Sequence, residues 1–216
     1  MDRLLSILDD DERAALLQRT RERRFGRNEV VFHEGDPGDT FHIVDRGLFV
    51  ARSSSTLGHV LTVNVFRAGA VFGELALLGD VARRTATVVS LRPGATRVLH
   101  RDDFEDLRAH NPKVDRFLVN VLADRNRQLT EQVIELMFTP THKRVLRELL
   151  RLDELKIASD EEGWIVLGQD ELAMLTGTTR ATVNRVLRGA ELKGQLELAR
   201  GKSRITDRAA IAREAR

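Results

Sequence analysis

Two short runs in the first half of the chain combine residue types that can hold a phosphate and a sugar. Gly73-Glu74-Leu75 is followed, ten residues after the glutamate, by Arg84-Thr85. Gly73 lets the backbone approach a ligand closely, and a helix that starts at Glu74 would point its first N–H groups at an anion. Arg84 can form a bidentate, charge-assisted pair with a phosphate, and Thr85 adds a hydroxyl and a main-chain donor. An ionised Glu74 only accepts hydrogen bonds, so it suits a ribose hydroxyl.

An alternative interpretation of the same residues needs no ligand. Glu74 and Arg84 carry opposite charges and can form an ion pair with each other across a barrel. The two interpretations predict different partners for Arg84: an incoming anion in the first, and the carboxylate of Glu74 in the second.

A second run, from Gln169 to Leu187, has the spacing of a helix-turn-helix. Ala173 lies where the second helix crosses close above the first, so a small residue is needed there. Gly177 supplies the positive φ of a tight interhelical turn, and Val183 fills the shared core. A second helix capped by Thr179 would carry its first turns into the DNA major groove. The residues on those turns are Arg180, Ala181, Thr182, Asn184 and Arg185.

The charge distribution supports a nucleic-acid surface near this run. The whole chain has a formal charge of only +2, which indicates no partner. Residues 180–204, however, hold seven basic groups and two acidic ones, a local charge of +5. This concentration is typical of a phosphate-binding surface, although a solvated helix face can also be basic.

Composition excludes several classes of protein. The chain has 216 residues, 42% hydrophobic and 31% charged, which is typical of a soluble globular protein. It has no cysteine, and hence no disulfide, thiolate metal site or cysteine nucleophile. It lacks a signal peptide and any run of about 18 apolar residues, so we expect a cytoplasmic protein without a membrane partner.

An enzyme built on a jelly roll is a remote alternative. The six histidines show no close pair at metal-ligand spacing, and no serine lies in a nucleophile elbow. We therefore expect no metal and no catalytic residue.

The elements that must position these runs change character along the chain. From Phe25 to about Arg101, short β-rich runs alternate with glycine-centred breaks, which is typical of an antiparallel barrel or jelly roll. After Pro112 a long helical pattern begins, and it breaks at Phe138-Thr139-Pro140 because proline cannot continue a helix. A further helix, a hairpin near Gly201 and a closing helix capped by Asp207 follow. Trp164 precedes the helix-turn-helix, and we assign it no role.

The long helix has a coiled-coil spacing. The residues Leu118, Leu122, Arg125, Leu129, Gln132 and Leu136 are 4, 3, 4, 3 and 4 apart, and we call them the inner stripe. We expect a homodimer paired along this stripe, whose polar members would weaken it and fix its register. The alternative is a core helix that packs against the barrel.

The chain resembles, over nearly its whole length, the cyclic AMP receptor protein/FNR (CRP/FNR) family of bacterial transcription regulators. The resemblance is most specific at Gly73–Leu77 with Arg84–Ala86, and at Thr179–Arg185, and the turns at 34–39 and 44–47 also match. It implies an α+β fold. The expected parts are an N-terminal double-stranded β-helix (a cyclic-nucleotide-binding jelly roll) at 1–111, a dimerisation helix at 112–138, and a winged helix-turn-helix at 139–216.

The resemblance implies roles for the residues of the first run. In members that bind cyclic AMP, the positions of Glu74, Arg84 and Thr85 hold the ribose 2′-hydroxyl and the cyclic phosphate, within the motif that includes Gly73 and Leu75. The position of Arg125 organises the pocket from the dimer helix.

Two neighbouring polar positions further along that helix contact the adenine, one from each subunit. They are Leu129 and Thr130 here, and only Thr130 can form a hydrogen bond. The implied effector is cyclic AMP, with a family member that binds DNA without nucleotide as the alternative that Leu129 supports.

At the DNA end, the resemblance makes Arg180 and Arg185 base-reading residues. Ala181 stands where the family commonly has a glutamate that accepts a hydrogen bond from cytosine, so the preference at that base pair should be altered. The implied partners are double-stranded DNA with a two-fold symmetric site, a second copy of the chain, and RNA polymerase. The positions that match phosphate contacts are Gln169, Thr179, Thr182 and Lys202.

Overall fold

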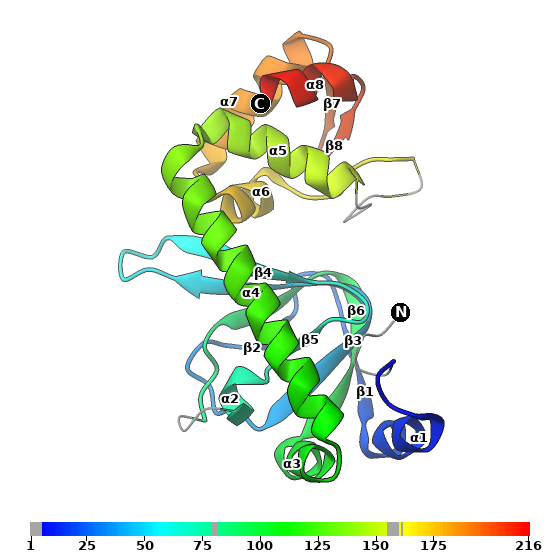
Figure 1. The fold of residues 1–216 in the computed structure, drawn as a ribbon. Helices are drawn as coiled ribbons and strands as arrows, with labels where there is room; N and C mark the ends of the chain where they lie inside the picture. The colour runs from blue at the N-terminus through cyan, green and yellow to red at the C-terminus, as the bar shows by residue number, and fades with distance from the viewer. Residues whose placement is uncertain (1–5, 79–81, 155–159, 161) are drawn as a thin grey trace. The chain divides into compact units, whose positions relative to one another are not determined.

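The computed structural model describes residues 6–78, 82–154, 160 and 162–216. The chain forms two compact units, one within residues 1–53 and 63–128, the other within 54–62 and 129–216. Figure 1 shows the helices and strands of each. Among the described residues, no helix is long and apolar enough to cross a membrane.

The first unit is an antiparallel β-roll. Its strands follow the order β1-β6-β3-β4, with β2 paired to β6 and β5 paired to β3. Two clusters of buried apolar side chains fill it, one around Phe41 and Phe104, the other around Phe49 and Phe72. The fold class predicted for this part of the chain is thereby confirmed. The strands are β1 (Arg21–Phe25), β2 (Val30–Phe32), β3 (Thr40–Ser54), β4 (Val60–Phe66), β5 (Val71–Phe72) and β6 (Thr87–His100).

Three helices of the chain belong wholly to this unit. They are α1 (Asp10–Arg19), α2 (Leu75–Leu78) and α3 (Arg101–His110). Helix α1 begins with a capping box, in which Asp9 accepts a hydrogen bond from Glu12 N and Glu12 accepts one from Asp9 N. These reciprocal bonds satisfy two otherwise unpaired N–H groups, which fixes the start of the helix.

The long helix α4 (Pro112–Phe138) has the predicted extent, and several members of the inner stripe contact other parts of the same chain. Leu118 is buried in the core of the roll. Arg125 donates hydrogen bonds to Glu74 and to the carbonyl oxygen of Val71. Gln132 donates to the carbonyl oxygen of Thr62 at 3.0 Å. Three of the six members of the inner stripe are thus engaged within the chain, which favours the alternative of a helix packed against its own roll for this part of the stripe, while Leu129 of the same stripe is 43% exposed.

A second stripe on α4, one residue further along, is exposed. It consists of Val119, Ala123, Asn126, Thr130, Val133 and Met137, again with spacings of 4, 3, 4, 3 and 4, and we call it the outer stripe. Its apolar members are unusually open: Val119 is 64%, Val133 53% and Met137 70% exposed. Such a row of exposed apolar side chains on one helix is typical of an interface.

The second unit contains the predicted winged helix-turn-helix. Its core is built around Leu149, Leu172, Val183 and Leu187, all at most 2% exposed. The strands pair as an antiparallel hairpin, and Asp207 caps α8 by accepting a hydrogen bond from Ala210 N, as predicted. The elements are α5 (Thr141–Glu154), α6 (Gln169–Thr176), α7 (Arg180–Leu192), β7 (Leu196–Ala199), β8 (Lys202–Ile205) and α8 (Arg208–Glu214).

Candidate functional site

Glu74 is a buried carboxylate at the start of α2, and its partner is Arg125. Its side chain is 1% exposed and forms an ion pair with Arg125 Nη1, while Arg125 Nη2 donates to Val71 O at 2.5 Å. The second carboxylate oxygen of Glu74, Oε2, is buried without a hydrogen-bond partner among the described residues. The predicted alternative, a Glu74–Arg84 ion pair, is therefore not what the structure contains.

Arg84 is held by the main chain of the roll. Its Nη1 donates to the carbonyl oxygens of Thr40 (2.8 Å) and Gly73 (3.2 Å), and its Nη2 donates to Thr40 Oγ1 at 2.5 Å. The guanidinium stacks on the ring of Phe32, 4.1 Å from the centroid. Arg84 Nε is buried and has no partner within the described part of the chain. The described residues thus accept hydrogen bonds from three of the five N–H groups of Arg84. The other two are Nε–H and one Nη2–H, which point in parallel directions in a guanidinium.

Burial makes this guanidinium receptive to an anion. Desolvation lowers the pKa of Arg84, while the nearby carboxylates of Asp39, Asp36 and Glu74 act in the opposite direction. Of these, Asp39 comes closest, at 3.9 Å from Nη2. A buried cation with few close counter-charges gains from a bound anion.

Gly73 is required at its position for two reasons. Its φ is +90°, which side-chain-bearing residues rarely adopt. A Cβ there would also lie 2.7 Å from Thr40 O and 2.9 Å from Arg84 Nη1. The glycine therefore permits the contact between the loop and Arg84.

His42 continues the hydrogen-bonded chain that orients Arg84, and nothing in the sequence around it indicated this role. Its Nε2 lies 3.3 Å from Thr40 Oγ1, and its Nδ1 lies 3.1 Å from Thr96 Oγ1. The ring is 1% exposed and stacks on Phe72. Burial, and then the charge of Arg84, lower the pKa of His42 to about 3. The imidazole is therefore neutral at neutral pH.

This depressed pKa predicts an acid sensitivity of the fold. An unfolded histidine takes up a proton near pH 6.5, whereas His42 resists protonation down to about pH 3. The free energy of unfolding should therefore be highest above pH 6.5 and fall with acidification, at about 1.4 kcal/mol per pH unit from this group. Denaturant unfolding from pH 7 to 4 measures the slope. We expect His42→Gln to flatten it by about one proton and the matched exposed variant His59→Gln to leave it unchanged; an equal slope in both would contradict the assignment.

The other predicted nucleotide-site residues lie at the surface. Thr85 is exposed directly after Arg84, and Leu75 is 43% exposed at the first position of α2. Thr130 is exposed on α4, in the second compact unit. The structure thus brings Gly73, Glu74, Arg84 and Arg125 together in one hydrogen-bonded cluster.

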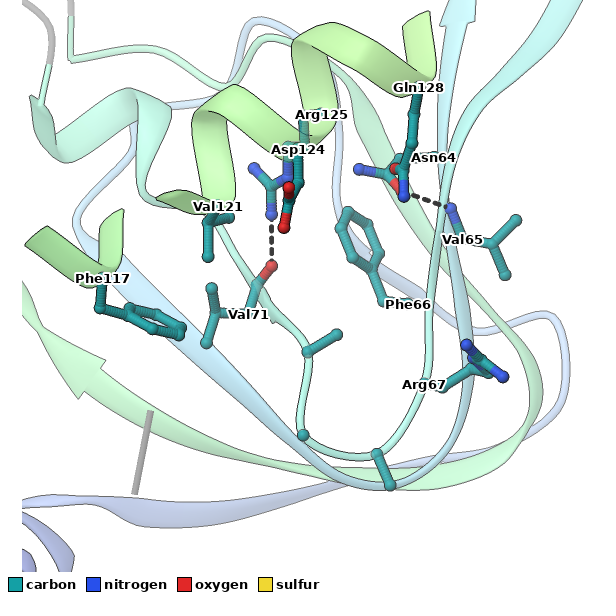
Figure 2. A pocket seen from close by; sticks show the side chains of 13 residues that line it. Asn64, Val65, Phe66, Arg67, Val71, Phe117, Val121, Asp124, Arg125 and Gln128 are labelled. Carbon is teal, nitrogen blue, oxygen red and sulfur yellow. Dashed lines mark hydrogen bonds between the residues drawn. The ribbon is translucent and has the colours of Figure 1, made fainter. Parts of the chain in front are cut away.

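The roll has an open pocket beside Arg125, which we call the hollow. The turn at 64–71 and the facing side of α4 enclose an open hollow of about 280 Å³ (Figure 2). Phe117 and Val121 line its apolar end, and Asp124 and Gln128 its polar end. The hollow lies on a different side of α4 from the outer stripe, because Gln128 is about half a turn from Asn126 and Val133.

In the second unit the helix-turn-helix has the predicted geometry. Gly177 adopts the left-handed conformation (φ 60°, ψ 46°), and its N–H donates to Ala173 O. Thr179 caps α7 by accepting a hydrogen bond from Thr182 N at 3.2 Å. Val183 is completely buried. These three features orient the first turns of α7 outward.

The predicted DNA-contact residues are exposed or partly exposed. Ala181, Asn184 and Arg185 are exposed on α7, and Arg185 has no ion pair within the described residues. Gln169 Nε2 donates to Asn184 Oδ1 at 3.0 Å, which links the starts of α6 and α7. A hollow of about 490 Å³ separates these helices from the wing; the basic residues that line it are Arg180, Arg188, Arg200 and Lys202.

Arg144 is a positioning residue that the sequence did not reveal. It donates hydrogen bonds to four main-chain carbonyl oxygens: those of Leu136 and Thr139 at the end of α4, and those of Thr176 and Gly177 at the helix-turn-helix. Arg144 therefore ties the end of the long helix to the turn that sets the recognition helix.

Comparison with known proteins gives matches to both units. A model of the cyclic nucleotide-binding domain matches residues 22–111, and a model of the Crp-like helix-turn-helix domain matches residues 143–214. The second match covers the helix-turn-helix and the wing.

Two characterised relatives match most of the chain. A CRP-like cAMP-activated global transcriptional regulator of Mycobacterium tuberculosis is 30% identical over 207 residues, which are 94% of this chain and 92% of that protein. The cyclic AMP receptor protein of Thermus thermophilus is 28% identical over 189 residues, 88% of this chain and 85% of that one.

Solved structures share the fold. The c-di-GMP responsive global regulator CLP of Xanthomonas campestris superposes with a TM-score of 0.81 at 22% identity, covering 91% of this chain and 99% of that one. A CRP/FNR family transcriptional regulator of Thermus thermophilus gives a TM-score of 0.76 at 25% identity, covering 90% of this chain and 98% of that one.

Proposed function

This chain belongs to the CRP/FNR family of transcription regulators, and on that premise we propose that it is a homodimer whose affinity for DNA is controlled by cyclic AMP bound in the roll. The observation that carries the proposal is the unused edge of Arg84. Among the described residues, Arg84 Nε–H has no partner, and Nη2 donates to Thr40 Oγ1 and lies 3.9 Å from Asp39 Oδ1. A phosphate can accept the parallel Nε–H and Nη2–H pair with two of its oxygens.

The residues of the cluster fit the parts of a cyclic nucleotide. A bound cyclic nucleotide supplies one negative charge and a ribose hydroxyl. The phosphate compensates the buried positive charge of Arg84. Glu74 Oε2, which is buried and without a partner among the described residues, accepts a hydrogen bond from the ribose hydroxyl. Arg125 holds Glu74 in place through the other carboxylate oxygen. Thr85 adds its hydroxyl from the surface.

We place the dimer contact on the outer stripe of α4. Val119, Val133 and Met137 are its exposed apolar members, and pairing with a second copy removes them from water. Asn126 stands at a position where a polar residue fixes the register of a coiled coil. Thr130 belongs to the same stripe, so this placement puts it at the dimer contact, where the resemblance implies that it reaches the adenine.

The nucleotide acts on DNA binding through this dimer. A ligand that binds one arrangement of the two long helices more tightly than another shifts their populations, and a coupling of about 1–3 kcal/mol is the usual size. Arg144 passes any displacement of the end of α4 to the turn before α7. The two recognition helices then match successive major grooves about one DNA turn apart.

Ala181 predicts an altered base preference. An exposed alanine offers only an apolar contact, for example to a thymine methyl group, whereas glutamate accepts a hydrogen bond from cytosine N4. Selection from random duplex DNA should therefore show no strong cytosine at the base pair facing position 181. Ala181→Glu should create that preference, worth about 1–3 kcal/mol, and Ala181→Gln should not. A strong cytosine for the wild-type protein would refute this role.

Isothermal titration calorimetry with cyclic AMP tests the proposal directly. We expect one binding event per protomer for the wild-type protein, and cyclic GMP as a comparison separates recognition of the phosphate and ribose from recognition of the base. If neither nucleotide binds while the protein still binds DNA, the alternative holds: a family member that needs no nucleotide.

A further inference from the structure

The outer face of the wing carries an aromatic ring between two cations. Trp164 is the single tryptophan of the chain. Lys202 Nζ lies 4.5 Å and Arg204 Cζ 4.7 Å from the centroid of its ring. Both distances are within the range of a cation–π interaction.

The strand pairing explains why these three side chains share one face. Ile165 pairs with Ser203 through two main-chain hydrogen bonds of 2.7 and 3.1 Å, which adds a short third strand to the hairpin. Ile165 and Ser203 are both buried, so their neighbours point the opposite way. Trp164 is thus placed opposite Arg204 and diagonal to Lys202.

Each of the two cations also contacts a carboxylate. Asp160 Oδ2 lies 3.7 Å from Lys202 Nζ, and Glu197 Oε2 accepts a hydrogen bond of 3.1 Å from Arg204 Nε. Asp160 is itself fixed, because its Oδ1 accepts a hydrogen bond from Trp164 N at 2.8 Å. The two cations therefore have defined places, although each remains more than 30% exposed.

We propose that Trp164 is a positioning residue for DNA binding: its ring fixes Lys202 and Arg204 on the wing so that both meet the DNA backbone beside the base pairs read by α7. Lys202 lines the basic hollow together with Arg180, which places it on the side of the recognition helix. The proposal rests on the proposed DNA contact of Lys202 and goes beyond it by assigning Trp164 and Arg204.

The physical basis is a smaller loss of side-chain freedom on binding. Free lysine and arginine side chains lose rotamer entropy when they are fixed. The indole ring restricts both side chains before DNA arrives, so less freedom remains to be lost. DNA phosphates then replace Asp160 and Glu197 as the counter-charges, and the two cations release counterions from the DNA.

Three variants test the proposal by fluorescence anisotropy with a labelled duplex at several salt concentrations. Trp164→Leu keeps an apolar side chain but removes the ring, and we expect its DNA affinity to fall about 3- to 10-fold, with a shallower dependence on salt. Trp164→Phe retains a π face and should recover most of the affinity. Glu197→Gln removes the carboxylate that competes for Arg204 and should bind DNA more tightly at low salt.

The wild-type protein supplies an independent readout that does not depend on a variant folding. Emission from Trp164 should change when unlabelled DNA is added, because phosphates approach the two cations that lie against its ring and change the electric field at the indole. The same titration with Lys202→Ala should give a smaller change. Unchanged affinity and salt dependence in Trp164→Leu, or unchanged emission on DNA binding, would overturn the proposal. Failure of the wild-type protein to bind any DNA would instead refute the proposed function.

Discussion

Replacing Arg84 by alanine is expected to abolish the effect of cyclic AMP on DNA binding and to spare DNA binding by the ligand-free protein. The guanidinium offers two charge-assisted hydrogen bonds to the phosphate, each worth about 1.5–3 kcal/mol. Their loss predicts a fall in cyclic AMP affinity of at least about 100-fold. The helix-turn-helix belongs to the other compact unit, so its surface is unchanged.

The matched control is the neighbouring arginine. Arg83 is exposed and donates to Gly35 O at 2.8 Å, so Arg83→Ala removes the same side chain one position away. We expect Arg83→Ala to bind cyclic AMP like the wild type. Arg84→Lys keeps the charge but not the parallel pair of donors, and it should recover only part of the affinity.

Alanine at position 84 also leaves the carbonyl oxygens of Thr40 and Gly73 without their donor. Thermal melting without ligand therefore accompanies the titration, to show that the variant is folded. If folded Arg84→Ala still responded to cyclic AMP, or lost DNA binding without the nucleotide, the separation of roles between the two units would be wrong.

Placing a carboxylate on the outer stripe should separate the dimer. In Val133→Asp the symmetric contact brings two charges into an apolar interface, and burying such groups costs several kcal/mol. We expect the dissociation constant of the dimer to rise about 100-fold or more. A monomer can contact only one half of a two-fold symmetric site, so DNA affinity should fall by a similar or larger factor.

Gln128→Asp provides the control for the outer stripe. It adds the same charge to α4 at an exposed position that lines the hollow beside Arg125 (Figure 2). We expect this variant to remain dimeric in sedimentation velocity. A dimeric Val133→Asp, or a monomeric Gln128→Asp, would show that the contact lies elsewhere.

Local features of the helix-turn-helix were predictable from sequence. The turn needs a positive φ at Gly177, and the cap needs the hydroxyl of Thr179, and both requirements act within a few residues. The structure confirms them for this reason. The helix break before Thr141 follows from Pro140 in the same way.

The side of α4 that pairs with a partner was not predictable from spacing alone. A period of 3.5 residues marks the inner and outer stripes equally well, and the four leucines of the inner stripe favour it in sequence. In the structure Leu118 and Arg125 of that stripe serve the chain's own roll. Periodicity identifies a buried face but not the molecule that covers it.

The partners of the charged groups Glu74 and Arg84 also depend on the topology of the fold rather than on their spacing in the sequence. Glu74 and Arg84 are ten residues apart and of opposite charge, which makes them a natural pair in sequence. The fold instead gives Glu74 to Arg125, on a helix 51 positions away, and gives Arg84 to main-chain carbonyls. His42 is one residue of a strand in sequence, and only the pairing of β3 with β6 brings it to Thr96.

The proposed function requires that a nucleotide bound in the roll sets the affinity for DNA. The measurement that tests it most directly is the dissociation constant of the wild-type dimer for a selected symmetric duplex, with and without saturating cyclic AMP at fixed salt. We expect cyclic AMP to change the dissociation constant for the duplex about 5- to 150-fold, which corresponds to a coupling free energy of about 1–3 kcal/mol. Equal dissociation constants in the two conditions, for a protein that binds cyclic AMP, would contradict it.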